Sequence, residues 1–498
     1  MSKSEKRHFK LFSTAQKGNK SYLQLFNAID AQDIYDEIQL KKKFERDKNF
    51  SQLAVSKNRL HSLILKNLSL YHSKRTVDFE VREALNQIEV LYFKGLYNQC
   101  LKIIDKEKKL CYTLQKYSLL LELVRWERKI RSFDIDNLQA VNLPVEEASN
   151  LLFKLSKLND YQFVSLSEWM LSNHTGRLRE EKDKDKFQKI LLDPLLENEP
   201  VDIGWEAQWH YWYTFFTHHK VMGEYEKAFH AAKRSLDLFD TIPGLVHEEV
   251  HKYISSLNNV AIALQELNRV EECISYTTKL RSFIKHPSLS FYTTIHIRSY
   301  IFSYMIELDA HLKNKRIKDA MRIIPFIEEF FELNPEEFSE YYKVGTYLEI
   351  ANVYFYAEDF KKSLFWINKT LNGLNDRLDL QPAARLMNII INYELNNIYT
   401  MDALIASTQH FLKRNKRLYE YEKNILSKLK KLQFSNSKAN EKKIMLEFMD
   451  SMQELLSDKY GKVALEYFDL PLWVEGKLEG KPILQLIEVK KKKTAIVQ

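Results

Sequence analysis

The sequence predicts an all-α protein, an α-α superhelix of stacked helical hairpins, and three observations support this fold class. Glycine (11) and proline (10) make up about 4% of the 498 residues, against a usual share of roughly 12%. Sheets need frequent turns, so this scarcity favours long helices joined by short connections. Tyrosine (27) and phenylalanine (29) are abundant enough to fill many helix–helix contacts. A pattern of two helices around a short turn also recurs along the chain.

The two clearest copies of this hairpin lie within residues 205–277. Helix A of the first copy carries large side chains at helical spacing: Trp205, Trp209, Trp212, Phe215 and Phe216. A turn at 223–225 follows, and helix B then presents small residues, namely Ala228, Ala231, Ala232 and Ser235. The pattern restarts after Gly244 with a second helix A, a turn at Asn268 and a helix B that contains Cys273. Because each hairpin can bury only one side, the copies must stack on one another.

Residues 1–77 are predicted to form a basic helical region before the repeats. Residues 1–75 contain 16 lysines and arginines against 7 acidic residues. The strongest helix is expected over 52–71, with its apolar side facing inward: Leu53, Leu60, Leu63, Ile64, Leu65 and Leu68. The same stretch is faintly similar to a DNA-reading helix, although a short preceding helix and a turn are not evident. A capping helical subdomain and a nucleic-acid-binding region therefore both stay open.

Residues 78–409 are predicted to form the repeat stack. Turns are expected at 95, 223, 268, 315, 358 and about 398, which gives spacings of 45, 47, 43 and about 40 residues from 223 onward. The gap between 95 and 223 leaves room for two further copies without a signature turn. Spacing alone places them at 117–131 with 145–158, and at 163–171 with 186–196.

These hairpins resemble tetratricopeptide-type repeats, which combine bulky helix-A residues, a Gly-x-Tyr turn and small helix-B residues. The residues that carry the resemblance include Gly95 and Tyr97, and Gly223, Tyr225 and Ala228. The spacing exceeds the 34 residues of that family and is also found in HEAT-type repeats. The resemblance implies a non-enzymatic scaffold that binds a protein or peptide along the concave face of the superhelix.

The repeat register predicts which helix-A residues would line that concave groove. They are the positions that do not point into the next hairpin: His210, Tyr213, Thr217, Lys220, Asn258, Ile262, Gln265, Met305, Asp309, Leu348, Asn352 and Tyr356. Asparagines such as Asn258 and Asn352 can pair with a peptide backbone through both a donor and an acceptor. The alternative is that each of these residues is merely solvated.

The carboxyl-terminal part is predicted to consist of long helices over 410–460 and an irregular cap with a basic tail over 461–498. A hinge is expected at 434–437, between a basic helix and a mixed one. Pro471, Gly476, Gly480 and Pro482 interrupt the last segment, which we interpret as a strap across the last repeat.

One motif could carry chemistry, namely His247-Glu248-Glu249-Val250-His251. On a single helix His247 and His251 share a face, and Glu248 could activate a zinc-bound water as in zinc proteases. A third ligand could come from His286 on the returning helix, but nothing around these residues resembles the sheet and substrate cleft of a protease. We therefore expect no metal, no cofactor and no enzymatic activity.

The sequence predicts a cytoplasmic protein that does not engage a membrane. No apolar run approaches the roughly 18 residues that span a bilayer, and no apolar signal region follows the first residues. The three cysteines, Cys100, Cys111 and Cys273, have neither a paired framework nor metal-ligand spacing. Three functions stay open: the peptide-binding scaffold, a nucleic-acid-associated regulator that binds DNA or RNA through basic residues 1–75, and a zinc hydrolase.

Overall fold

The computed structural model describes residues 1–15, 21–45, 52–133, 138–175, 181–286, 289, 293–338, 340–373, 380–415, 418, 420–435, 437–457 and 468–497. Within these ranges the chain contains α-helices and two short 3-10 helices and no strand, which confirms the all-α prediction. None of the helices described is both long and apolar enough to cross a bilayer. The chain forms two compact units, residues 1–157 with 244–248 (unit 1) and residues 158–243 with 249–498 (unit 2).

Unit 1 begins with four helices, α1 (Lys3–Ala15), α2 (Ser21–Asp30), α3 (Glu37–Phe44) and α4 (Leu53–Tyr71). They enclose a small core of their own that includes Phe9, Leu25, Leu40 and Leu60. The predicted helix over 52–71 is therefore present. Leu65, expected to face inward, is instead exposed, because the buried positions of α4 follow Leu53, Leu60 and Asn67 at seven-residue spacing.

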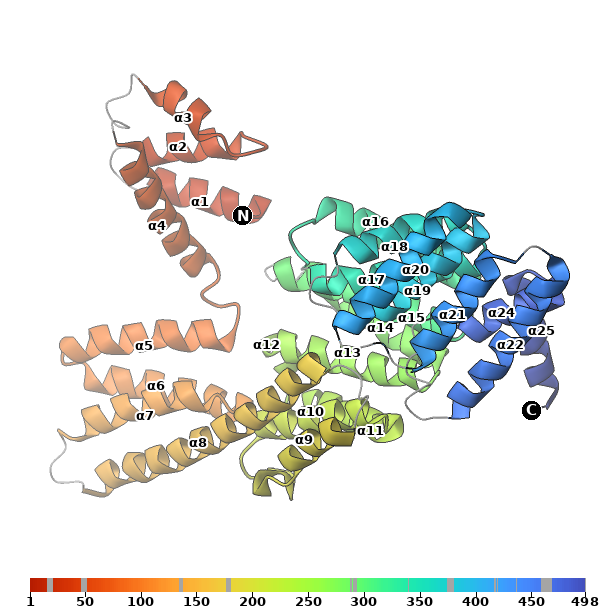
Figure 1. Ribbon diagram of the computed structural model, residues 1–498. Helices are drawn as coiled ribbons and strands as arrows, with labels where there is room; N and C mark the ends of the chain where they lie inside the picture. Colours follow the sequence, from red (N-terminus) through yellow and green to blue (C-terminus); the bar gives the residue numbers. More distant parts are fainter. Residues whose placement is uncertain are drawn as a thin grey trace. The chain divides into compact units, whose positions relative to one another are not determined.

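The next helices of unit 1 are α5 (Val77–Phe93), α6 (Tyr97–Leu114) and α7 (Tyr117–Arg131); α6 packs on α5, and α7 packs on α6 (Figure 1). Helix α8 (Leu138–Thr175) then runs for 38 residues without interruption. The second helix of one predicted copy (145–158) and the first helix of the next (163–171) are therefore parts of one continuous helix. No glycine lies between residues 145 and 175, and the apolar spacing continues through Leu158 and Tyr161, so nothing in this stretch ends the helix.

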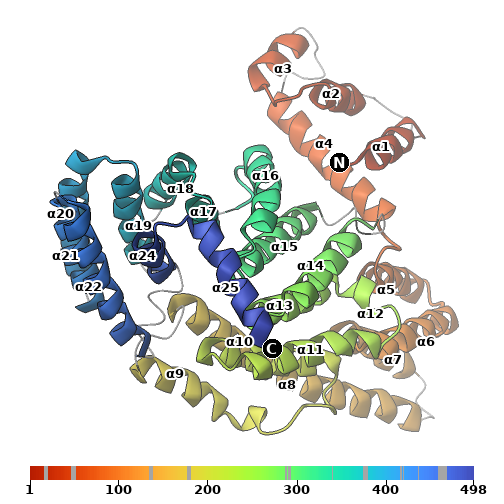
Figure 2. The same ribbon diagram turned by 90° about the vertical axis from the view of Figure 1, so that its right-hand side faces the viewer.

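Unit 2 contains the remainder of α8, the short helix α9 (Glu181–Leu191) and the best-formed hairpins. Its helices pair in chain order (Figure 2): α10 (Trp205–Met222) with α11 (Tyr225–Asp237), α13 (Val250–Glu266) with α14 (Val270–Ile284), α15 (Thr293–Lys313) with α16 (Ile317–Leu333), α17 (Glu340–Tyr356) with α18 (Phe360–Asn372), and α19 (Gln381–Glu394) with α20 (Ile398–Arg414). Helix α12 (Leu245–Glu248) belongs to unit 1.

One turn geometry joins the helices of each hairpin. Seven residues adopt the left-handed conformation with φ of 55° to 74°: Gly95, Gln115, Gly223, Asn268, Lys315, Glu358 and Asn396. Each donates its backbone N–H to the carbonyl three residues earlier, and the following residue donates to the carbonyl five residues earlier. At Asn268 these hydrogen bonds measure 3.1 Å to Gln265 and, from Arg269 to Leu264, 2.9 Å. This pattern is the Schellman type of helix ending, and it satisfies carbonyls that the helix would otherwise leave unpaired.

The side chains around this turn follow the same register in all seven cases. Helix B always starts two residues after the left-handed residue with an apolar side chain: Tyr97, Tyr117, Tyr225, Val270, Ile317, Phe360 and Ile398. The residue five positions after the left-handed residue is always 0% exposed: Cys100, Leu120, Ala228, Cys273, Ala320, Ser363 and Met401. The turns predicted at 95, 223, 268, 315 and 358 are confirmed, and the sixth lies at 396 rather than about 398. A seventh, at Gln115, was not predicted.

The end of unit 2 contains α21 (Glu420–Gln433), α22 (Lys438–Ser457), α24 (Leu470–Glu479) and α25 (Ile483–Val497). The predicted hinge at 434–437 separates α21 from α22. The expected irregular cap is helical where the structure describes it: α24 starts at Leu470, with Pro471 in its first turn, and ends at Gly480, which is left-handed. Trp473, Val474 and Leu486 join one continuous apolar core that begins at Ile301.

Candidate partner-binding face

The predicted groove residues all lie on the first helices of the unit 2 hairpins, α10, α13, α15 and α17 (Figure 2). We call the side formed by these helices and by α19 the A face. Side chains connect neighbouring helices along it. Trp209 on α10 donates its indole N–H to the Ser256 hydroxyl on α13 at 2.9 Å, and Lys252 of α13 pairs with Glu206 of α10 at 2.9 Å.

The connections continue toward the carboxyl ends of these helices. Gln265 of α13 donates to Asp309 of α15, while Lys313 of α15 pairs with Glu266 of α13 at 2.9 Å. Lys315, in the turn after α15, donates to the Tyr356 hydroxyl of α17 at 3.2 Å. Each left-handed turn brings the end of one A helix beside the end of the next, so these polar groups form a continuous edge.

Lys315 is the best-defined charged group on this edge. Its ammonium lies 2.8 Å from the Asp469 carboxylate and 4.5 Å from the centre of the Tyr356 ring. Burial opposes its charge, but Tyr356 and Asp469 outweigh burial and hold the pKa of Lys315 above its ordinary value. For the Tyr356 phenol, by contrast, burial itself raises the pKa. The network therefore contains a charged lysine held by one carboxylate and one neutral phenol.

The carboxyl-terminal segment covers the distal part of the A face. The Asp469 N–H donates to the Tyr356 hydroxyl at 3.2 Å, and Ile483 N–H donates to Glu358 at 2.9 Å. Trp473 and Lys477 both donate to Glu394, each at 2.6 Å.

Helix α25 continues this cover toward the turn after α15. Lys491 donates to the Lys315 carbonyl at 3.2 Å. From Trp473 to Lys491 the segment thus passes the turns at 396, 358 and 315 in reverse chain order.

The twelve predicted groove residues divide into two groups by exposure. Seven are partly exposed: His210, Tyr213, Lys220, Asn258, Ile262, Met305 and Asp309. Five are buried: Thr217, Gln265, Leu348, Asn352 and Tyr356. Leu348 belongs to the apolar core, and Asn352 donates to the Leu348 carbonyl at 2.9 Å. Of the predicted residues, those that remain accessible therefore lie on α10, α13 and α15, while the buried α17 positions contact their own chain.

His210 is the most perturbed titratable group of the predicted set. Its Nδ1 lies 2.8 Å from the Ser165 hydroxyl on α8. Burial, with a smaller effect of the Lys252 charge, lowers the pKa of His210 to about 3. The imidazole is therefore neutral at physiological pH and connects α8 to α10 within unit 2.

The structure corrects the geometry assumed for the candidate zinc motif. Helix α12 ends at Glu248, Glu249 is non-helical with φ of −118° and ψ of 49°, and α13 starts at Val250. His247 and His251 therefore do not share one helix. Glu248 accepts the backbone N–H of Val77 at 3.0 Å, as a cap for α5. Across the described part of the chain, no group of three or more His, Cys, Asp or Glu side chains is placed to hold a metal ion.

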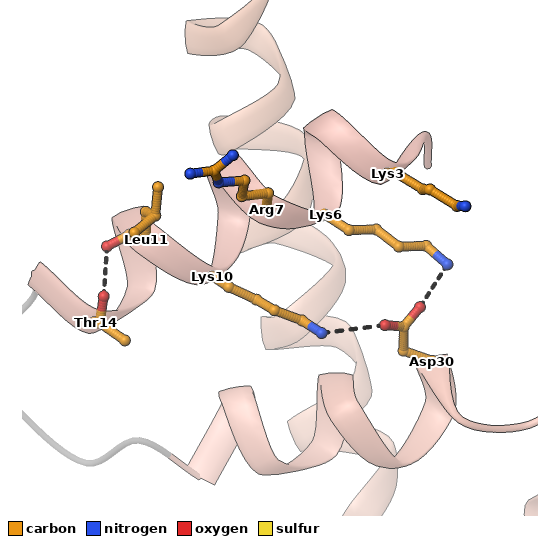
Figure 3. Close-up of a pocket in the computed structure, with 7 residues that line it drawn as sticks. All are labelled: Lys3, Lys6, Arg7, Lys10, Leu11, Thr14 and Asp30. Carbon is orange, nitrogen blue, oxygen red and sulfur yellow. Dashed lines mark hydrogen bonds and ion pairs between the residues drawn. The ribbon is translucent and has the colours of Figure 1, made fainter.

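A basic pocket lies on the amino-terminal helix α1. It is open, has a volume of about 400 Å³, and is lined mainly by the cations Lys3, Lys6, Arg7 and Lys10. Figure 3 shows Lys6 and Lys10 reaching Asp30 while Arg7 points away from it. The hydrogen bond from Lys6, opposed by partial burial, holds the pKa of Asp30 below its ordinary value. Four cations thus line a pocket that contains one carboxylate, which is an arrangement suited to anions.

Sequence reasoning missed the edge residues Glu266, Lys313 and Lys315. It considered the middle of each A helix, whereas the connections between repeats concentrate in the last turn. A signal was present, since Glu266 and Lys313 are separated by 47 residues, the spacing of the turns at 268 and 315. No protein-family model matches the chain, and no match to a curated protein was found.

Proposed function

We propose that the chain is a non-enzymatic, tetratricopeptide-like scaffold that binds a protein or peptide on its A face. The supporting observation is the turn that recurs seven times with the same hydrogen bonds and the same buried position five residues later. Repeats built on one register present equivalent side chains at regular intervals, which suits an extended ligand. The buried, reduced thiols of the three cysteines are in keeping with a cytoplasmic location.

The ligand would contact α10, α13 and α15, because α24 and α25 cover the distal edge. Tyr213, Asn258, Ile262 and Met305 are partly exposed there. They offer aromatic, amide and aliphatic surface in consecutive repeats, which favours a mixed apolar and polar peptide over a highly charged one.

Site-specific photo-crosslinking in the source cell tests this proposal. A photoreactive phenylalanine at position 262 should capture a partner protein, while the same residue at 365 should not, because Phe365 is 53% exposed on helix α18 of the opposite side. The double variant Asn258→Ala and Met305→Ala should weaken capture at 262. Equal capture at both positions, or capture unaffected by the double variant, would exclude the A face.

A second candidate function is a nucleic-acid-associated regulator that uses residues 1–75, and the α1 pocket favours it. Its four cations lie on one face of a helix, as phosphate contacts require. Binding of duplex DNA that falls steeply with salt and is weakened in the Lys3→Ala and Arg7→Ala double variant would support this function. DNA binding that depends neither on salt nor on Lys3 and Arg7 would exclude this second function.

A further inference from the structure

Five aromatic side chains gather at one end of the α5–α7 layer in unit 1. We call them the aromatic platform: Tyr92, Phe93, Tyr97, Trp126 and Phe133. They come from the carboxyl end of α5, the first residue of α6 and the end of α7. Figure 1 shows these three helix ends on the same side of the layer. The left-handed turn at Gly95 makes this possible, because it reverses the chain between Phe93 and Tyr97.

The rings of the platform form a contiguous surface. Tyr97 and Phe133 stack with centroids 5.1 Å apart and planes at 15°. Tyr92 contacts Tyr97 at 5.6 Å and Trp126 at 5.4 Å. Trp126 and Phe133 are seven residues apart along α7 and the turn after it, so they lie on one face. The platform therefore presents ring surface from three consecutive segments of the chain.

This surface remains open to water. Phe93 is 75% exposed and Phe133 is 57% exposed. Core packing does not explain their positions, because the buried residues of the same helices are Ile88, Leu123 and Ile130. Neighbouring exposed aromatic rings are uncommon on a protein surface and mark a binding site more often than isolated ones.

Cations lie beside the rings of the platform. The Lys129 ammonium lies 4.2 Å from the Tyr92 ring centre and 4.7 Å from that of Trp126. Lys94 directly follows Phe93, and Arg125 lies one helical turn before Lys129 on the same face of α7. Both are exposed, and no ion pair of theirs is found among the described residues.

Among the residues that the structure describes, the acidic groups near the platform are either paired or further away. Glu127 is held by Lys108 at 2.8 Å and by Arg131 at 2.7 Å. Glu89 and Glu122 lie a helical turn before Phe93 and Arg125, respectively. Unit 1 as a whole contains 29 lysines and arginines against 20 acidic residues. The surface at this end of the layer is therefore aromatic with a cationic rim.

We propose that the aromatic platform binds single-stranded nucleic acid. Unpaired bases expose ring faces that stack on aromatic side chains, and the adjoining phosphates need the cations that line this surface. A duplex hides its base faces and would use only the cations. An acidic peptide would likewise leave the exposed rings without stacking partners. The proposal goes beyond the scaffold function, because it lies in unit 1 and uses none of the A-face residues.

Fluorescence anisotropy with a labelled oligothymidylate or oligouridylate of about 16 nucleotides tests the proposal on the full chain. Phe93→Ala combined with Phe133→Ala should weaken binding by about tenfold or more, because stacking on two rings is lost. Phe163→Ala is the matched control, since this ring is 69% exposed on α8 within unit 2, and it should bind as the unmodified protein does. All three side chains are exposed, so the variants should fold, which circular dichroism verifies.

A salt titration tests the cationic rim separately. Arg125→Ala with Lys129→Ala should reduce the slope of log K against log salt by about 1.4, because each phosphate contact to a single strand contributes about 0.7. The A-face variant Asn258→Ala with Met305→Ala should bind the oligonucleotide normally, which separates this proposal from the scaffold function.

Three results would overturn the proposal. The first is unchanged binding in the Phe93 and Phe133 double variant. The second is a preference for a duplex of the same length, or binding that depends on Lys3 and Arg7 alone. The third is no oligonucleotide binding at about 50 mM salt, together with loss of a cross-linked protein partner in the Phe93 and Phe133 variant, which would assign the platform to a protein.

Discussion

At the scale of single residues, the left-handed turn position is the most informative feature. Five of the seven turns use a residue with a side chain, namely Gln115, Asn268, Lys315, Glu358 and Asn396. The left-handed conformation costs an L-residue about 1 kcal/mol relative to glycine. The chain tolerates this cost because the two Schellman hydrogen bonds and the buried residue five positions later define the turn without glycine.

Replacing the turn glycine at 223 tests this cost directly. Gly223→Ala should destabilise unit 2 by about 1 kcal/mol, and steric clash does not contribute, because a Cβ there would meet no atom within 4 Å. Asn268→Gly, at the equivalent position, should be neutral or stabilising by up to about 1 kcal/mol. Urea midpoints measure both. A loss of stability in Asn268→Gly as large as in Gly223→Ala would contradict the conformational argument.

The half-buried His210 gives unit 2 a defined pH dependence. Its folded-state pKa of about 3 lies below the ordinary value of 6.5, so between these values the unfolded chain binds the extra proton. Stability therefore falls as pH decreases from about 6.5 toward 3.

His210→Gln should flatten that decline, while His230→Gln, at an exposed position of α11, should not. Denaturant midpoints between pH 7 and pH 5 provide the measurement. Parallel declines in the His210 variant and the unmodified chain would exclude this histidine as the cause.

At the scale of elements, the carboxyl-terminal helices contact turns that lie far earlier in the sequence. Asp469 has two roles, because one oxygen accepts the Leu472 N–H at 3.1 Å and caps α24, while the other faces Lys315. The two side chains of this ion pair are only 27% and 32% exposed. The pair between Lys318 and Glu488 is 77% and 62% exposed, so water screens it far more strongly.

The stability that each of these two ion pairs contributes can be compared by replacing its carboxylate with an amide. Asp469→Asn keeps the helix cap but removes the charge beside Lys315, and it should cost about 1–2 kcal/mol because a partly buried ammonium loses its counter-ion. Glu488→Gln should cost less than about 0.5 kcal/mol. Thermal unfolding of both variants decides the point. Similar losses would mean that the Lys315 network adds nothing beyond an ordinary surface pair.

At the scale of the whole molecule, the chain divides into two compact units, and we expect them to unfold separately. Trp126 is the only tryptophan of unit 1, and the other six lie in unit 2. The fluorescence difference between the unmodified chain and Trp126→Phe therefore reports on unit 1 alone. We expect its denaturant midpoint to differ from that of the remaining signal. One shared midpoint across both signals would show that the units unfold together.

The recurring turns could be predicted from the sequence, whereas structural features that occur only once could not. Turns at 95, 223, 268, 315 and 358 could be predicted, because glycine or a polar residue precedes an apolar residue by two positions in each. Helix α8 broke the pattern, since spacing alone cannot distinguish a hairpin from one continuous helix. The burial of Tyr356 could not be predicted either, because its cover comes from Asp469, 113 residues later. The platform rings lie 41 residues apart in the sequence, between Tyr92 and Phe133, and only the fold brings them together.

The cover formed by residues 468–491 has a consequence for biosynthesis. The turns at 315 and 358 emerge from the ribosome well before the helices that contact them, with Lys491 following Lys315 by 176 residues. A nascent chain can form each hairpin while Phe355 and Tyr356 still face water. Translation of the final helices then removes this apolar surface, so incomplete copies would expose a signal that chaperones and proteases can recognise.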